Sequence, residues 1–136
     1  MDEELEGIEG IGTVRRIDAV LTKLHLSVPE LEGFGLVSAE GLPIHLSIPM
    51  EWESTGMGED YVCAVVSGLV GIAETSGVRF QKKGFERVTV KFTDSYFAAV
   101  KVNDNCYLFV IASDKVKLGM LHVSMDEAAK SLAPYV

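Results

Sequence analysis

The 136-residue sequence predicts an α+β fold, a five-stranded antiparallel sheet with helices on both faces. Apolar periodicities give the order helix, two strands, helix, three strands, helix. Short polar turns join the strands within each run, so those pairs are antiparallel. The last strand, residues 106–112, is apolar on both sides and should therefore be central and covered on both faces.

The chain begins with an acidic, glycine-interrupted segment, residues 1–12, which we expect to be a flexible lead-in to a single domain over residues 13–136. Thr13 is a suitable N-cap for a first helix, residues 13–26. The apolar residues of this helix are spaced 3, 4 and 3, which places them in one stripe: Val14, Ile17, Leu21 and Leu24.

The first two strands, residues 33–38 and 42–48, form a predicted hairpin. Gly41 ends the short turn between them and is suited to a positive φ. The second strand alternates, with its apolar side chains on one side: Leu42, Ile44, Leu46 and Ile48. Pro43 has no N–H to give to a neighbour, so this strand should lie at a sheet edge.

A loop, residues 49–58, leads into a long helix, residues 59–80, with acids at the positive end of its dipole. One broad side of this helix is apolar: Tyr61, Val62, Val65, Val66, Leu69, Ile72 and Ala73. Beside it runs a stripe of small residues: Ala64, Gly68, Gly71 and Thr75. Each glycine inside a helix costs about 1 kcal/mol relative to alanine. Two on one face therefore indicate that another element approaches closely.

Three strands follow, at residues 85–92, 96–102 and 106–112, joined by tight turns. In the first of them Val88 and Val90 alternate with polar residues. A final amphipathic helix has apolar residues spaced 3, 4, 3 and 4, and Pro134 follows it: Leu118, Leu121, Met125, Ala128 and Leu132.

The net charge of −8 and the pI of about 4.8 disfavour nucleic acid and acidic lipid surfaces as partners. The longest apolar run, residues 61–73, is shorter than the roughly 20 residues of a membrane span, so we expect no membrane insertion. The acidic N-terminus is unlike a signal peptide. Cys63 and Cys106 lie in apolar runs, where buried free thiols are typical of a reducing compartment. We therefore expect a cytoplasmic protein.

No catalytic constellation is found in the sequence. His25, His45 and His122 lie 20 and 77 residues apart, without a cysteine or carboxylate at metal-ligand spacing. The glycines at 56 and 58 precede a helix, but no phosphate-binding lysine follows, and acids stand where the anion would bind. We expect no catalytic residues, no cofactor and no metal, and hence not an enzyme.

Basic residues gather after the long helix, in an otherwise acidic chain: Arg79, Lys82, Lys83, Arg87 and Lys91. Cations at a helix C-terminus and a polar strand face would account for them. The functional alternative is a contact patch for an acidic partner, formed by Arg79, Lys82, Lys83 and Arg87.

Two strings and their order resemble the roadblock (dynein light chain) family over about residues 14–133. They are Gly33-Phe-Gly-Leu-Val-Ser-Ala-Glu-Gly-Leu-Pro-Ile44 and Tyr107-Leu-Phe-Val-Ile-Ala-Ser113, the latter followed by Leu118-Gly119 and a helix. The resemblance implies a sheet of strand order 2-1-5-4-3. It also implies dimerisation through the long second helix and third strand, and docking or regulation of small Ras-like GTPases without turnover. The loop after Ile48 and the acidic lead-in depart from the family pattern.

Two functional hypotheses follow. In the first, the chain is a homodimeric adaptor. The small stripe allows a second helix to approach closely, and the strand at 85–92 is an edge without a proline or bulge, which could pair with another strand. The predicted interface is Ala64, Gly68, Gly71, Thr75, Val88 and Val90. In the second, it is a ligand-sensing domain of the profilin-like, PAS or GAF type, which would need a roomy pocket lined by a few polar groups.

Overall fold

The computed structural model describes the backbone of residues 2–136 and the side chains of residues 12–136. The elements in chain order are α1 (Asp2–Ser27), β1 (Leu31–Ser38), β2 (Pro43–Ser47), α2 (Met50–Ser54), α3 (Glu59–Arg79), β3 (Arg87–Lys91), β4 (Ser95–Asn103), β5 (Cys106–Ser113), α4 (Leu118–Leu132) and the 3₁₀ helix η1 (Ala133–Tyr135).

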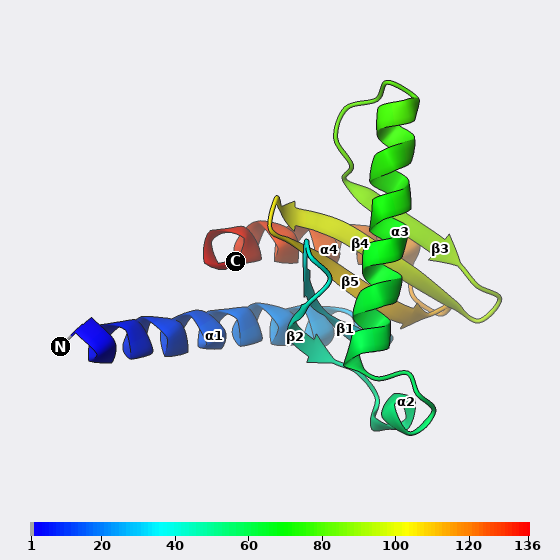
Figure 1. Cartoon of the computed structure of the whole chain (residues 1–136). Coiled ribbons are helices and arrows are strands. Elements are labelled where there is room, and N and C mark those ends of the chain that lie inside the picture. The colour runs from blue at the N-terminus through cyan, green and yellow to red at the C-terminus, as the bar shows by residue number, and fades with distance from the viewer. Residues whose placement is uncertain (1) are drawn as a thin grey trace.

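The strands form one antiparallel sheet of order β2-β1-β5-β4-β3. Helices α1 and α4 cover one face and α3 crosses the other, which confirms the predicted fold class (Figure 1). The apolar strand β5 is central, between β1 and β4. Pro43 lies in the edge strand β2, where the register shifts opposite Val37. Gly41 takes a φ of 87° in the turn before it, as its position predicted.

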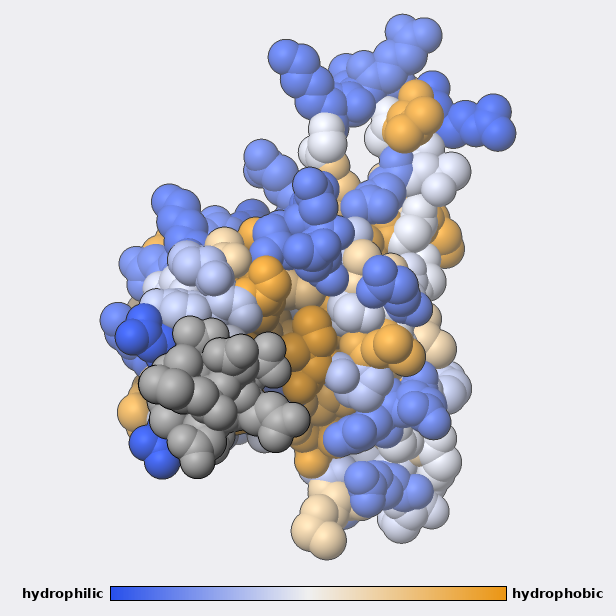
Figure 2. Space-filling model, turned by 60° about the vertical axis from the view of Figure 1, so that its left-hand side comes forward, coloured by the Kyte–Doolittle hydropathy of each residue, from blue (hydrophilic) through white to orange (hydrophobic). Residues whose placement is uncertain are grey.

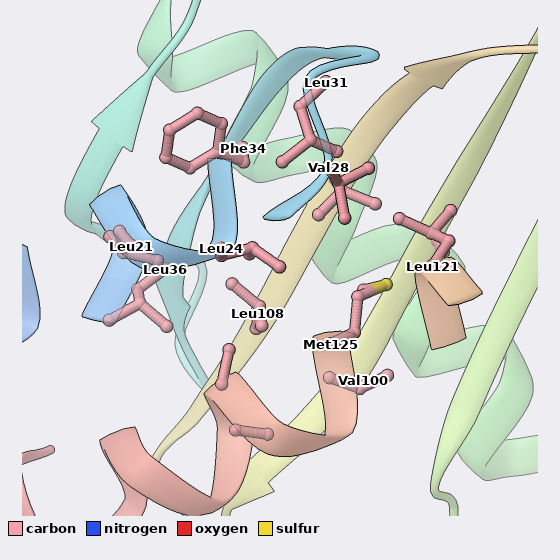
Figure 3. Packing of buried hydrophobic residues seen from close by; sticks show 14 of the residues in the cluster. Leu21, Leu24, Val28, Leu31, Phe34, Leu36, Val100, Leu108, Leu121 and Met125 are labelled. Atoms are coloured by element: carbon pink, nitrogen blue, oxygen red, sulfur yellow. The ribbon is translucent and has the colours of Figure 1, made fainter. Parts of the chain in front are cut away.

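Alternate side chains of β5 supply two hydrophobic clusters. Leu108 points toward α1 and α4, where it packs with Leu21, Leu121 and Met125 (Figure 3). Val110 belongs to the same cluster. On the opposite face, Tyr107 and Phe109 pack beneath α3 with Val62, Cys63, Val66 and Val70. Because β5 is covered on both faces, neither of its sides is polar.

The first helix differs from its prediction at its N-terminal end. It begins at Asp2, and the expected start at Thr13 is wrong. Acids at this end favour a helix through its dipole, despite the glycines that follow. Val14 is exposed, whereas the rest of the predicted stripe is buried, because the N-terminal half of α1 runs past the sheet (Figure 1). The division into a flexible lead-in and a domain stays a prediction.

The segment between β2 and α3 contains the short helix α2, where the sequence predicted only a loop. The helix places Trp52 over β1, where a Cβ on Gly33 would lie 3.2 Å from the indole ring. In β2, Leu46 and the following Ile48 pack against the cluster under α3, but Leu42 and Ile44 are exposed. An edge strand is covered only where a helix reaches it, so the predicted apolar side of this strand is buried in part.

The buried side of α3 is also displaced from the predicted one. Cys63 and Val70 are buried, whereas Tyr61, Val65 and Ile72 are exposed. The helix lies across the sheet and its C-terminal end projects beyond it (Figure 1). Only a narrow stripe of α3 packs on the sheet, and much of the apolar surface of the helix is exposed in a single copy.

A candidate self-association surface on α3 and β3

The small-residue stripe of α3 faces solvent. All four of its residues are exposed: Ala64, Gly68, Gly71 and Thr75. A Cβ added at Gly68 or Gly71 would meet nothing within 4 Å. Larger apolar side chains flank the stripe, with Ile72 67% and Val78 77% exposed. The structure thus leaves open the face on which the sequence predicted a close neighbour.

Strand β3 is a free edge among the described residues, since it pairs only with β4. The amide of Lys101 donates to the carbonyl of Glu86, and that of Phe92 donates to Ser95. Because backbone groups alternate in direction along an antiparallel pair, the N–H and C=O groups of Arg87, Thr89 and Lys91 point away from β4. These groups are available to another strand.

The side chains predicted for the interface on β3 lie on the α3 side of the sheet. Val88 and Val90 are half-buried and pack against the cluster beneath α3. The exposed stripe and the free edge therefore belong to neighbouring elements on the same side of the molecule. The predicted interface residues are brought to one region, and their contact with a second copy stays a prediction.

A polar contact ties the second half of α3 to the central strand. The Tyr107 hydroxyl donates to Oε1 of Glu74 at 2.9 Å, and the ring of Phe85 meets that of Tyr107 edge-on at 6.3 Å between centroids. Burial, and then the bond to Glu74, raise the pKa of Tyr107 to about 12. The sequence analysis missed this contact, because nothing in the spacing of the two residues connects them.

The predicted basic patch is divided between two faces. Arg79, Lys82 and Lys83 are exposed at the projecting end of α3, where hydrophilic residues in Figure 2 surround an exposed hydrophobic one. Arg87 instead reaches α4, where its Nη2 lies 2.5 Å from Oδ1 of Asp126. The alternation of side chains along β3 sends Arg87 to the opposite face from its valine neighbours. Arg87 therefore lies apart from Arg79, Lys82 and Lys83, and the contact of these residues with a partner stays a prediction.

A histidine lies next to this ion pair on the α4 side. Nε2 of His122 is 3.1 Å from Oγ1 of Thr89, so α4 and β3 are joined there. Desolvation by burial, together with the positive charge of Arg87, lowers the pKa of His122. The negative charge of Asp126 acts in the opposite direction, but the net shift is downward. The neutral imidazole is the form that this environment favours.

Two open hollows on the surface have both charged and uncharged residues in their linings. One, of about 620 Å³, lies between β3, β4 and α4 and includes Lys101 and Lys130 in its lining. The other, of about 660 Å³, lies at the start of α3 and is lined by Glu53, Glu59, Asp60, Tyr61 and two glycines. Within the described residues no three His, Cys, Asp or Glu side chains are grouped to hold a metal ion. Both hollows are open to solvent, whereas a ligand-sensing pocket encloses most of its ligand.

Both cysteines are free and buried. Burial raises the pKa of the Cys106 thiol to about 11, so it is a packed thiol and not an activated nucleophile. By length and composition α3 would also suit a membrane span, a criterion that core helices of folded domains meet as well. In this structure α3 packs on the sheet through its buried stripe.

Fold and surface together define a class: small domains in which helices cover both faces of a five-stranded antiparallel sheet and one of these helices has exposed apolar side chains. The sequence profile of the Roadblock/LC7 domain matches residues 17–112, and the chain belongs to this family. The family expectation from the two sequence strings is thereby confirmed. A search of curated proteins finds no match.

Solved structures share the fold at low sequence identity. The Roadblock/LC7 domain from Streptomyces avermitilis is 22% identical, with a TM-score of 0.76 over 87% of this chain and 95% of that one. MglB from Myxococcus xanthus is 16% identical, with a TM-score of 0.77 over 88% and 86%. The gliding protein MglB from Thermus thermophilus is 13% identical, with a TM-score of 0.78 over 90% of each chain.

Proposed function

We propose that this chain is a non-catalytic adaptor domain that forms a homodimer and docks and regulates a partner protein, a small Ras-like GTPase. One observation carries the proposal: the exposed apolar face of α3 lies beside an unpaired sheet edge, in a chain of the Roadblock/LC7 family. Exposed apolar surface of this kind marks an interaction site. The family resemblance supplies the kind of partner.

The dimer is supported by the chemistry of both elements. Small residues along α3 let a second helix backbone approach closely, which bulky side chains would prevent. Strand β3 has outward N–H and C=O groups and no proline to block pairing, so a second β3 would extend the sheet. Both contacts are self-complementary, as a two-fold dimer requires.

The adaptor role without turnover is supported by the surroundings of both cysteines and of Glu74. The two thiols are packed in the core, and Glu74 is held by Tyr107. We propose a role without turnover, with no cofactor, in the cytoplasm, where free thiols persist. A solved MglB of similar fold has a tetrameric arrangement, which supports association between copies. Paired α3 helices would offer the partner one continuous platform.

Self-association is tested by light scattering on wild type and Gly68→Leu at tens of micromolar. Open space around the Cβ position lets leucine fit the monomer, and the helix gains about 1 kcal/mol in propensity. We expect wild type to be dimeric and Gly68→Leu to be monomeric without loss of folded-state stability. Gly77→Leu is the matched control, since that glycine is also unobstructed but lies outside the stripe. A monomeric wild type would contradict the dimer.

The partner is tested with purified Ras-like GTPases from the same organism. Each is loaded with GDP or a non-hydrolysable GTP analogue and titrated with the adaptor. We expect one of them to bind the wild-type dimer with a preference for one nucleotide state, and the Gly68→Leu monomer to bind more weakly. If the dimer binds none in either state, the GTPase assignment is wrong and the adaptor serves another class of partner.

A further inference from the structure

The sheet-facing side of α3 continues past the edge of the sheet. Phe80, the C-cap residue of the helix, follows the buried Val62 by 18 residues, which is five full turns. The two residues therefore lie on the same side of α3, yet Val62 is 6% exposed and Phe80 is 72% exposed. The difference arises because the end of α3 projects beyond the sheet (Figure 1). A Cβ at Gly77, three residues earlier, would likewise meet nothing within 4 Å.

Cations surround this exposed aromatic side chain. Arg79 directly precedes Phe80, whereas Lys82 and Lys83 follow it after one residue, and all three cations are exposed. Residues 75–85 contain these cations and no acid, in a chain whose net charge is −8. None of the ion pairs between described side chains involves them. We call Arg79, Phe80, Lys82 and Lys83 the α3 end patch.

The turn after α3 holds the two lysines close to Phe80. Gln81 has a φ of 56°, in the left-handed region that glycine usually occupies after a helix. The amide of Gln81 donates to the carbonyl of Val78 at 3.1 Å, and the amide of Lys82 donates to that of Gly77 at 2.8 Å. These two bonds close the last turn of the helix. The backbone of the patch is therefore already ordered, which lowers the entropic cost of binding.

We propose that the α3 end patch docks a partner protein through a segment that is rich in Asp and Glu and has a large apolar side chain to cover Phe80. This inference rests on the proposed docking role, for which it names a surface and the chemistry that binds there. Carboxylates complement the three cations, and the guanidinium of Arg79 suits a bidentate pair with one of them. An apolar side chain from the segment removes the exposed ring of Phe80 from water.

The patch is separate from the surface that we propose for self-association. Gly71 precedes Phe80 by nine residues, or two and a half turns, so the two lie on opposite sides of α3. A segment docked over Phe80 therefore leaves the small stripe free. A bilayer of acidic lipids matches the patch less well, because it would repel the rest of this acidic chain over a wide area. A protein segment contacts the patch alone.

Peptide binding to the full chain tests this proposal. The probe is a synthetic peptide of glutamates around two leucines, and two comparison peptides replace either the leucines with serine or the glutamates with lysine. In an NMR titration we expect the probe to shift the backbone amide signals of residues 77–85. We expect each comparison peptide to bind at least about tenfold more weakly than the probe. Binding of the probe should weaken as salt is raised, because exposed charges are screened.

Two variants separate the charged and apolar parts of the patch. Lys82→Glu with Lys83→Glu reverses the charge beside the ring, whereas Phe80→Ser removes the apolar anchor and keeps the cations. We expect each variant to bind the probe at least about tenfold more weakly than wild type does. Circular dichroism checks that each variant keeps its helices, since all the changed side chains are exposed.

Matched controls change the same residue types elsewhere. They are Lys115→Glu with Lys117→Glu, and Phe92→Ser, because these side chains are also exposed and lie outside α3. We expect both controls to bind the probe as wild type does. Equal binding by wild type and the patch variants, or signal shifts confined to other parts of the chain, would overturn the proposal.

The remaining outcomes distinguish this inference from the proposed function. Tighter binding to phosphatidylserine vesicles than to the probe would replace the protein segment with a lipid surface and so contradict the inference. A monomeric chain that binds the probe at the patch contradicts the dimer alone. A dimeric chain that binds its GTPase but not the probe contradicts the acidic segment alone.

Discussion

The hydroxyl of Tyr107 donates to the carboxylate of Glu74 at 2.9 Å and so joins the central strand β5 to the second half of α3. Most of the buried apolar residues of α3 lie in its first half, at Val62, Cys63 and Val66. The contact with Tyr107 therefore holds the helix close to the point where it projects beyond the sheet. The orientation of the surface that we propose for self-association depends on it.

Removal of this hydroxyl should destabilise the fold moderately. We expect Tyr107→Phe to lower the free energy of unfolding by about 0.5–1.5 kcal/mol, the usual net contribution of one hydrogen bond. Urea unfolding of a monomeric background such as Gly68→Leu separates this effect from dimerisation. Tyr96→Phe is the control, since Tyr96 is a partly buried tyrosine on the neighbouring strand β4. An equal loss in both variants would show that the bond to Glu74 adds nothing.

The same residue predicts an alkaline limit to stability. The pKa of Tyr107 is raised from 10.0 to about 12 in the folded state, mainly by burial. Between these two values the unfolded chain has lost the proton that the folded chain keeps, so the free energy of unfolding falls as pH rises. We expect unfolding curves collected from about pH 9 to 11 to show this decline in wild type and a smaller one in Tyr107→Phe. Parallel declines would assign the effect to other groups.

The central position of β5 predicts a large cost for a cavity there. Leu108 is fully buried between the sheet and helices α1 and α4. We expect Leu108→Ala to lower the free energy of unfolding by about 2–5 kcal/mol, as large-to-small core substitutions do. Leu42→Ala, at an exposed leucine of the first hairpin, should change it by less than about 0.5 kcal/mol. Denaturant unfolding measures both, and similar small losses would contradict the role of β5.

The arrangement of the strands was predictable because its signals are local. An apolar run without a polar side has to be covered on both faces, which placed residues 106–112 at the centre. Pro43 cannot donate inside a ladder, which placed its strand at an edge. Gly41 adopted the positive φ that the turn requires. Each inference uses only the residue and its immediate neighbours.

The face of α3 was predicted less well, because periodicity identifies apolar residues without saying which of them one copy covers. Tyr61 and Ile72 were assigned to the apolar side of the helix, and both are exposed. Cys63 was left out of that side and is buried. Angular position around a helix also says nothing of how far the helix extends beyond the sheet. The placement of Arg87 against Asp126 depends in the same way on tertiary packing.

The contact between His122 and Thr89 predicts an acid limit to stability, which acts close to the free edge of β3. Burial and Arg87 lower the pKa of His122 below its ordinary value of 6.5, against the opposing charge of Asp126. As pH falls below that ordinary value, the unfolded chain takes up a proton that the folded chain still resists, so the free energy of unfolding falls with pH. We expect unfolding midpoints to decrease between about pH 7 and pH 5, and His122→Gln to remove part of the slope while its amide still reaches Thr89. Equal slopes in both proteins would show that the acid limit comes from carboxylates elsewhere. A reduced slope would place the titration at the junction of α4 and β3, where protonation would also disturb the strand that we propose to pair with a second copy.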